Sequence, residues 1–224
     1  MLRQHQAYIN ALESFGVTVR VLPADPEFPD GCFVEDVALV TPGLAVITRP
    51  GAASRRGESG AIESLLAEDH DIARIIAPGC VDGGDIVMTD SCALIGLSRR
   101  TNTDGARQLE QILAARGTPS RIVPVCDGLH LKSYVNFIGH ETLLVTTDYA
   151  ETPEFSGFQQ LAVCAGEEYA ANCVVCGEQA IVTAGYPETL ALLEDFGFAI
   201  TALDMSECRK MDGGLSCLSL RFGN

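Results

Sequence analysis

The start of the chain shows two different spacings of apolar residues. Over residues 2–15 they recur at helical spacing, which predicts an amphipathic helix that ends at Gly16. Residues 17–22 then follow an alternating apolar and polar pattern, which predicts a strand. Residues 32–40 predict a second strand with two carboxylates in its middle, and a short turn leads from it into a further strand over residues 44–48.

This plan of strand, turn, strand, polar loop, helix and further strand recurs about every 45 residues. At each recurrence, polar residues interrupt an apolar strand: Glu35-Asp36, Gly84-Asp85, His130-Leu131-Lys132, Asn172 and Ser216-Cys217. The helices are expected over residues 57–68, 104–116, 152–163 and 187–196. Because carboxylates, a histidine and a lysine are unfavourable in a buried strand, they are expected to need partners or a ligand.

Such units cannot bury their apolar faces alone, so repetition favours a closed ring with the helices outside. The sequence therefore predicts an α/β fold, a five-bladed propeller of ββαβ-type units in one domain over residues 1–224. The first blade lacks its opening strand, because the chain opens on a helix. A doubly wound open sheet is the competing architecture.

Composition narrows the class of partner. The chain has 224 residues, 47% of them hydrophobic, and a net charge of −15, which argues against nucleic-acid and anionic-membrane partners. A negative field favours small cationic substrates, although a solvated acidic surface is the more common reason for such a net charge. No apolar run reaches the roughly 20 residues of a membrane-spanning helix, and the polar start is not a secretory signal, so a cytoplasmic location is expected.

The nine cysteines are too sparse for a disulfide-stapled secreted module. Cys173 and Cys176 form a C-x-x-C pair, which a redox or zinc site would use. They fall in a predicted strand over residues 170–176, where positions three apart point to opposite faces, and no second pair lies nearby. Buried apolar packing is therefore the expected role of these two cysteines.

Several residues have the chemistry of a catalytic site, although each alone is a weak signal. Cys217 follows two glycines and a serine, an unhindered loop that can aim a thiol into a cleft. His130 is the histidine best placed to serve that cysteine as an acid or base. Arg55 and Arg100 lie in equivalent loops of successive units, and guanidinium groups bind carboxylates bidentately. With the acidic turn at residues 82–85, this set suits a zwitterionic amino acid that carries a cationic tail.

Six motifs in this order make the set recognisable: FPDGCFVEDVALV, VITRPGAASRRGE, VDGGDIV, IGLSRRTN, DGLHLKS and MDGGLSC. They span residues 28–217 and closely resemble the dimethylarginine dimethylaminohydrolases of the guanidino-modifying enzyme superfamily. The resemblance implies a five-bladed α/β propeller, no metal or other cofactor, and a small-molecule substrate. The implied reaction is hydrolysis of asymmetric dimethylarginine or monomethylarginine to citrulline and dimethylamine or methylamine, a part of arginine metabolism linked to nitric oxide regulation.

The resemblance also implies roles for individual residues. Cys217 resembles the nucleophile that attacks the guanidinium carbon, with an S-alkylthiouronium intermediate. His130 resembles the acid/base group, and Asp82 the carboxylate that orients it and pairs with the guanidinium. The implied substrate-binding residues are Asp36 and Glu35 for the guanidinium, Asp30 for the α-ammonium, and Arg55 and Arg100 for the α-carboxylate.

Members of that family begin with a further strand and a loop that covers the site, ahead of the segment that starts here at Met1. The ring is therefore expected to be open, with weaker substrate binding, or to be completed by a strand from a second copy in a homodimer. Two other functions remain open on the sequence: a deiminase acting on free arginine, and a weakly active protein that binds methylated arginines.

Overall fold

The computed structural model describes residues 1–126 and 128–223. Asp127, the first residue of the DGLHLKS motif, lies outside the described residues. The chain divides into two compact units. Unit 1 comprises Met1–Pro23 and Ser133–Ser216, and unit 2 comprises Ala24–Lys132 and Cys217–Asn224.

Unit 2 contains two three-stranded sheets, β1-β2-β3 and β4-β5-β6. In each sheet the first two strands form an antiparallel hairpin and the third strand joins in parallel, after helix α2 (Ser59–Leu66) or helix α3 (Thr103–Ala114). The strands are β1 (Ala38–Thr41), β2 (Leu44–Ile47), β3 (Asp71–Arg74), β4 (Ile86–Met88), β5 (Ala93–Leu97) and β6 (Ser120–Pro124). Both sheets and α3 contribute to one buried core, which includes Val46, Ile86, Ile95, Leu109 and Leu113.

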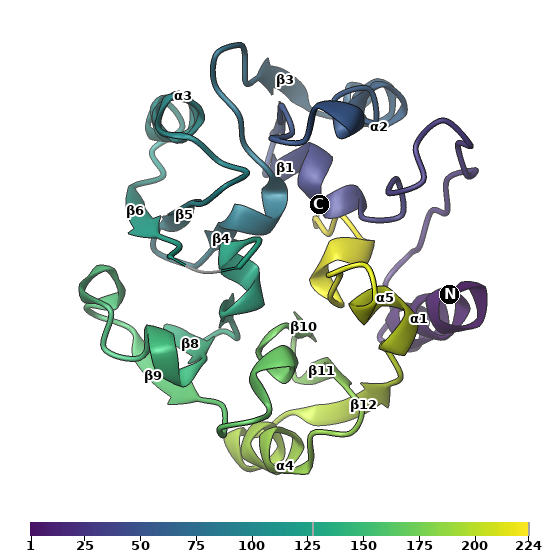
Figure 1. Ribbon diagram of the computed structural model, residues 1–224, viewed down its shortest axis with the longest axis vertical. Coiled ribbons are helices and arrows are strands. Elements are labelled where there is room, and N and C mark those ends of the chain that lie inside the picture. Colours follow the sequence, from purple (N-terminus) through teal and green to yellow (C-terminus); the bar gives the residue numbers. More distant parts are fainter. Residues whose placement is uncertain (127, 224) are drawn as a thin grey trace. The chain divides into compact units, whose positions relative to one another are not determined.

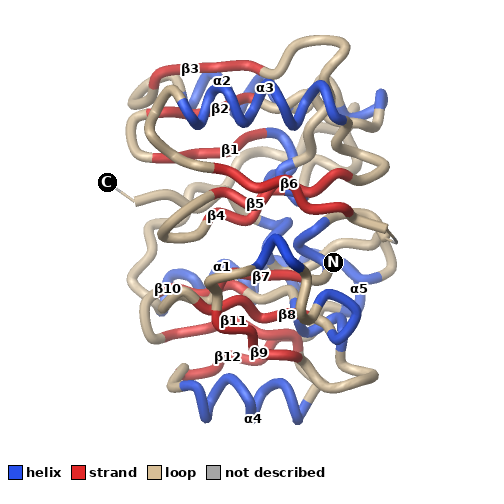
Figure 2. The backbone as a smooth tube through the Cα atoms, turned by 90° about the vertical axis from the view of Figure 1, so that its left-hand side faces the viewer, coloured by secondary structure: helices blue, strands red, loops and turns tan. Residues whose placement is uncertain are grey.

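Unit 1 repeats the same sheet twice, in β7-β8-β9 and β10-β11-β12. The strands are β7 (Val135–Phe137), β8 (Thr142–Val145), β9 (Gln159–Ala162), β10 (Val174–Cys176), β11 (Gln179–Thr183) and β12 (Ala199–Leu203). Its helices are α1 (Leu2–Ser14), α4 (Pro187–Phe196) and the short α5 (Ser206–Arg209), and α4 lies against β12 (Figures 1 and 2). The described residues thus form an α/β fold with four three-stranded sheets.

Three of the four predicted helices after the hairpins are confirmed as α2, α3 and α4, and the first predicted helix is confirmed as α1. The bounds of α4 match the prediction because a proline occupies its first turn and Gly197 ends it with φ of 117°. The helix predicted over residues 152–163 is wrong. That segment forms a short 3₁₀ turn, Pro153–Phe155, and then β9, with Gly157 between them at φ of 94°.

Three strand predictions also need correction. The strand predicted over residues 170–176 begins only at Val174, and Ala170 and Ala171 lie in a 3₁₀ turn, Glu168–Ala171, before it. Residues 17–22 form no strand, although exposure alternates from Val17 to Arg20. The strand predicted from residue 32 begins only at Ala38, and Glu35 and Asp36 lie in the 3₁₀ turn η1 (Val34–Val37) before it.

All five polar interruptions in fact lie in or beside 3₁₀ turns. These turns are η1, η3 (Gly83–Asp85), η4 (Leu131–Ser133), η7 (Glu168–Ala171) and η8 (Ser216–Leu218). The first four each lead into the opening strand of a sheet, whereas no strand follows η8 among the described residues. Consecutive side chains on a 3₁₀ turn point in three directions, whereas those on a strand point to two opposite faces. Buried polar groups on these turns can therefore reach partners in more directions.

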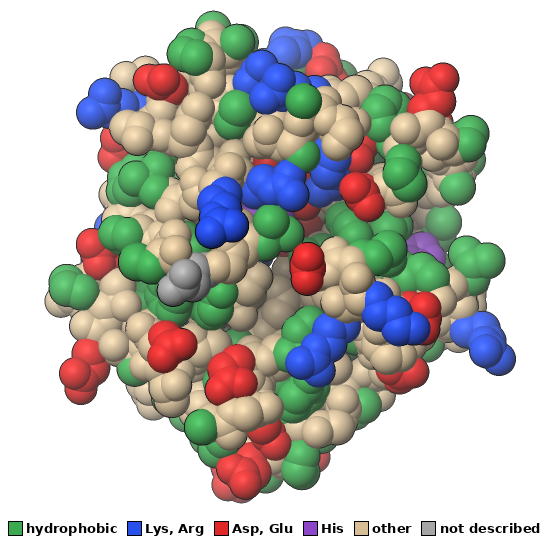
Figure 3. Space-filling view, in the orientation of Figure 1, with side chains coloured by type: hydrophobic (Ala, Val, Ile, Leu, Met, Phe, Trp, Pro, Cys, Tyr) green, Lys and Arg blue, Asp and Glu red, His purple; other side chains and the backbone are tan. Residues whose placement is uncertain are grey.

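The remaining expectations concern cysteines, membranes and charge. All nine cysteines lie within the described residues, and none of them forms a disulfide. Cys173 is part of the buried core of unit 1, as expected, whereas Cys176 in β10 is only half-buried. No helix in the described part of the chain is long and apolar enough to cross a membrane. Acidic and basic side chains are both exposed on the face shown in Figure 3.

Candidate active site

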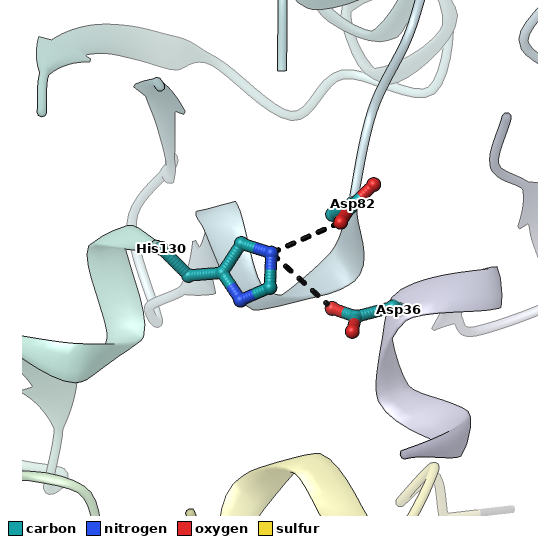
Figure 4. Close-up of side chains that lie close together, drawn as sticks. All are labelled: Asp36, Asp82 and His130. Carbon is teal, nitrogen blue, oxygen red and sulfur yellow. Dashed lines mark hydrogen bonds and ion pairs between the residues drawn. The ribbon is translucent and has the colours of Figure 1, made fainter. Parts of the chain in front are cut away.

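His130 and Asp82 form a buried pair in unit 2 (Figure 4). Nε2 of His130 lies 3.0 Å from Oδ2 of Asp82, and the two side chains are 7% and 1% exposed. The other oxygen of Asp82 accepts a hydrogen bond from the backbone N–H of Gly51 at 2.8 Å, and the N–H of Asp82 donates to Thr101 Oγ1 at 3.1 Å. The carboxylate is therefore held in one orientation, which in turn orients the imidazole.

Asp36 is the second carboxylate beside the imidazole (Figure 4). Its Oδ1 lies 3.8 Å from Nε2 of His130 and accepts a hydrogen bond from the N–H of Gly84 at 2.9 Å. Turn η1, which carries Asp36, packs directly on turn η3: a side chain at Gly83 would overlap the carbonyl of Glu35. The two glycines of the DGGD motif therefore permit a close approach of backbones rather than a flexible turn.

These carboxylates determine the protonation of the histidine. Burial by itself lowers the pKa of His130, but the negative charge of Asp36, the hydrogen bond that His130 donates to Asp82 and the charge of Asp85 outweigh it and raise the pKa to about 9. At neutral pH His130 is therefore an imidazolium. A buried imidazolium is a proton donor, and its charge also favours a neighbouring thiolate.

Asp85 is a site residue that the sequence analysis recorded only as a polar interruption. It is fully buried, and burial raises its pKa, although His130 and hydrogen bonds from Ser98 and Thr101 oppose that change. Its Oδ1 accepts the N–H of Leu131 at 2.9 Å. Asp85 thus fixes the start of the turn that presents His130. The signal available in the sequence was its repeat position, which matches that of Asp36.

Arg55 is buried among acidic partners rather than exposed to a cleft. Its guanidinium contacts Asp36 at 2.5 Å and Glu58 at 2.6 Å, and it also donates to the backbone carbonyl of Phe33 at 3.0 Å. Burial lowers its pKa, but Glu58 and Asp36 more than compensate, so the pKa lies above its ordinary value. The observed contacts of Arg55 therefore orient Asp36.

Glu35 also has cationic partners within unit 2. Lys132 Nζ lies 2.6 Å from Glu35 Oε1 and also donates to the carbonyl of Gly83 at 3.3 Å. Arg221 Nη2 lies 3.7 Å from the same carboxylate oxygen. Arg221 is in the C-terminal segment that begins with Cys217, so this ion pair brings the segment with the candidate nucleophile to the acidic turn η1.

Asp30 and Arg100 are placed differently from the other predicted site residues. Both are half-buried, and neither side chain has a hydrogen bond or ion pair within the described ranges. The Arg100 backbone carbonyl packs against Gly51, where a side chain would overlap it, and Gly51 is the residue that binds Asp82. Cys217 lies in η8 and is half-buried.

Asp36, Asp82 and His130 also form a group that can bind a metal ion, since their ligand atoms lie within 4.8 Å of one another. A metal requires a neutral imidazole, so it would have to displace the proton that the two carboxylates stabilise on His130. The same electrostatics that make His130 an acid thus oppose metal binding at neutral pH.

Comparison with known proteins identifies the family. Residues 1–152 match the family model described as N,N dimethylarginine dimethylhydrolase, eukaryotic. An N(G),N(G)-dimethylarginine dimethylaminohydrolase from Pseudomonas aeruginosa is 44% identical over 223 residues, which are 99% of this chain and 88% of that protein. The chain belongs to the dimethylarginine dimethylaminohydrolase family. A Streptomyces coelicolor protein of the same name is 34% identical over 99% of this chain and 85% of its own length.

Solved structures agree with this assignment to the dimethylarginine dimethylaminohydrolase family. A Pseudomonas aeruginosa member, solved as a mutant complexed with citrulline, superposes with a TM-score of 0.96 at 43% identity and covers 99% of this chain and 88% of that one. An amidinotransferase from Microseira wollei superposes with a TM-score of 0.85 at 18% identity, covering 99% and 83% of the two chains, which shows a common fold.

Proposed function

We propose that this chain hydrolyses Nω-methylated arginines, namely asymmetric dimethylarginine and monomethylarginine, to citrulline and dimethylamine or methylamine. The observation that carries the proposal is the buried imidazolium of His130 between Asp82 and Asp36, in a chain that matches the family over nearly its whole length. Acidic groups beside a proton donor suit a substrate that is a cation and whose leaving group is an amine.

In the first half of the reaction, the thiolate of Cys217 attacks the guanidinium carbon and forms a C–S bond. The tetrahedral adduct then loses the methylated nitrogen. The electron pair of that C–N bond leaves with the amine, and the imidazolium of His130 supplies its proton. The product is an S-alkylthiouronium on Cys217, and His130 becomes neutral while Asp82 keeps its ring in place.

In the second half, water attacks the thiouronium carbon and gives a proton to the now neutral His130. The C–S bond breaks, and its electron pair returns to Cys217 as thiolate. The carbon keeps the oxygen, whose second proton passes to solvent, so the product is the ureido group of citrulline. His130 ends as the imidazolium from which it started, which its raised pKa of about 9 favours.

The substrate would be bound at three places. Asp36, Asp82 and Glu35 pair with the guanidinium, and the substrate cation competes with Lys132 for Glu35. Asp30 takes the α-ammonium, which its unpaired carboxylate among the described residues supports.

Of the two arginines assigned to the α-carboxylate, Arg100 has no other side-chain partner in the part of the chain described. Arg55 is already bound to Asp36 and Glu58, so it contributes to the carboxylate only through the N–H groups that these partners leave. Arg100 is therefore the main carboxylate ligand in this proposal.

The decisive experiment measures citrulline and amine release from asymmetric dimethylarginine, monomethylarginine and arginine. We expect turnover of both methylated substrates and little ammonia from arginine. A Cys217→Ser variant should release no amine, because an alcohol at ordinary pKa does not replace the thiolate. Parent-like dimethylamine release by Cys217→Ser would refute the covalent mechanism, and faster turnover of arginine would indicate a deiminase instead.

Some predictions about assembly go beyond the described structure. The five-bladed ring, the single domain over residues 1–224, the homodimer and the cytoplasmic location stay predictions. Light scattering coupled to size-exclusion chromatography tests the homodimer directly. A dimer would have a measured molar mass of twice the 23.8 kDa of the chain.

A further inference from the structure

Ser216, the residue before the proposed nucleophile, is held by a buried asparagine of unit 1. Asn172 directly follows turn η7 and is 5% exposed. Its amide oxygen accepts the N–H of Ser216 at 2.9 Å, and its amide nitrogen donates to Ser216 Oγ at 3.0 Å. One side chain thus binds both the backbone and the side chain of Ser216, which is itself fully buried. Two hydrogen bonds to the same residue fix the orientation of Ser216, whereas a single hydrogen bond would allow it to rotate.

The loop of residues 213–216 packs directly against the side-chain amide of Asn172, because Gly214 has no side chain to separate them. A Cβ at Gly214 would lie 2.5 Å from Oδ1 of Asn172 and 2.6 Å from its Cγ, so a larger residue would push the loop away. Gly214 is therefore needed for contact, and it does not loosen the loop as its sequence context alone indicates.

Asn172 is in turn supported by its surroundings. Asn136 in β7 is 7% exposed and donates to the carbonyl of Ala171 at 2.8 Å, which fixes the end of η7. At the other end of the loop, the hydroxyl of Tyr169 in η7 donates to the carbonyl of Gly213 at 2.6 Å. Turn η7 therefore holds the loop at Gly213 and at Ser216. These contacts all lie within unit 1.

We propose that Asn172 is a positioning residue for the nucleophile. By binding Ser216 it sets the direction in which the chain enters Cys217, and so the line along which the sulfur meets the guanidinium carbon. The backbone has only two soft dihedral angles per residue, so a fixed Ser216 leaves the next side chain few directions. The inference rests on the proposed role of Cys217.

The size of the effect follows from the geometry of covalent attack. A misplacement of about 1 Å at a reacting atom lowers the rate about 100-fold. Asn172→Leu removes both hydrogen bonds to Ser216 while keeping a side chain of similar size. We expect it to lower kcat about 100-fold and to change KM by less than about threefold, because the residue touches no part of the substrate.

Two further variants test the same contact. Asn172→Asp keeps oxygen acceptors for the N–H and the O–H of Ser216, so it should recover kcat to within about tenfold of the parent. Gly214→Ala disrupts the contact from the loop side and should lower kcat as Asn172→Leu does.

A second measurement does not depend on turnover. Cys217 is the sole cysteine between Lys210 and Arg221, so its alkylation by iodoacetamide can be followed in one tryptic peptide as a function of pH. We expect the alkylation rate of Cys217 in Asn172→Leu to differ about tenfold from that of the parent, since the thiol has left its fixed place.

Thr142→Val is the matched control for stability. Thr142 is fully buried in unit 1, and its hydroxyl donates to the carbonyl of His140 at 3.0 Å, away from the loop. This variant should lose stability but keep kcat. A kcat within about threefold of the parent in Asn172→Leu would overturn the inference, as would equal kcat losses in Thr142→Val at matched stability.

Failure of the proposed function gives a different result. If the parent releases no amine from methylated arginines, the reaction assignment is wrong. The alkylation profiles of the parent, Asn172→Leu and Thr142→Val still decide whether Asn172 positions Cys217, and identical profiles in all three would reject it.

Discussion

The imidazolium of His130 should make the stability of the folded chain depend on pH above neutrality. Burial lowers the pKa of His130, but Asp36, Asp82 and Asp85 outweigh that effect and raise the pKa to about 9 in the folded chain, from an ordinary value of 6.5. A raised pKa contributes stability that is fully present below about pH 6.5 and is lost as pH rises through about 9. The two pKa values differ by about 2.5, and each unit is worth about 1.4 kcal/mol, so about 3 kcal/mol should be lost.

The assay is urea-induced unfolding between about pH 6 and pH 10. Cysteines also titrate in this range, so the comparison needs a variant that retains them. His130→Gln is suitable because its neutral amide replaces the imidazole without a titrating proton. The difference in unfolding free energy between parent and variant should fall by about 3 kcal/mol across the range. Asp82→Asn should reduce this dependence, since it removes a negative charge that raises the pKa of His130.

Parallel curves for the parent and His130→Gln over that range would refute the reasoning. They would mean that His130 is neutral in the folded chain, and the step in which it protonates the leaving amine would lose its basis. If the difference instead rose with pH up to about 6.5 and were flat above it, burial would outweigh the carboxylates and lower the pKa of His130.

Three other substitutions have expected outcomes. Asp82→Asn should lower kcat about 1,000-fold and move the pH profile of kcat/KM to lower pH, because His130 loses its orienting carboxylate; an unshifted profile would contradict this. Gly83→Ala should destabilise the chain by about 2 kcal/mol in chemical denaturation, since the added methyl overlaps a neighbouring carbonyl, and parent-like stability would disprove that packing. Arg100→Lys should raise KM about tenfold with kcat nearly unchanged, whereas Arg99→Lys, at an exposed neighbour, should change neither.

The sequence predicted most of the local structure for identifiable reasons. The helical spacing of α1 and the proline and glycine that bound α4 are signals carried by nearby residues. The repeat was equally visible, because each sheet has its own hairpin and returning strand. The errors lie where a short apolar stretch was read as one regular element. Residues 152–163 contain a turn and a strand, and residues 32–40 contain a turn before the strand.

The candidate site shows a similar division. The motifs identified His130 and Asp82, and the structure places these two in contact, together with Asp36. The partners of the charged residues could not be read from the motifs. The sequence predicted that Arg55 binds the substrate carboxylate, but in the structure its guanidinium already binds Asp36 and Glu58.

The sequence by itself thus determined most of the helix and hairpin pattern, the repeat and the family, and it proposed the residues of the chemistry, since each depends on residue type and on spacing along the chain. The tertiary structure alone decided the charge on His130, the burial of Asp85 and the two hydrogen bonds between Asn172 and Ser216. These depend on contacts between residues more than forty positions apart in the chain, such as Asp85 with Leu131 and Asn172 with Ser216. Such contacts follow from packing in three dimensions, and no local pattern encodes them.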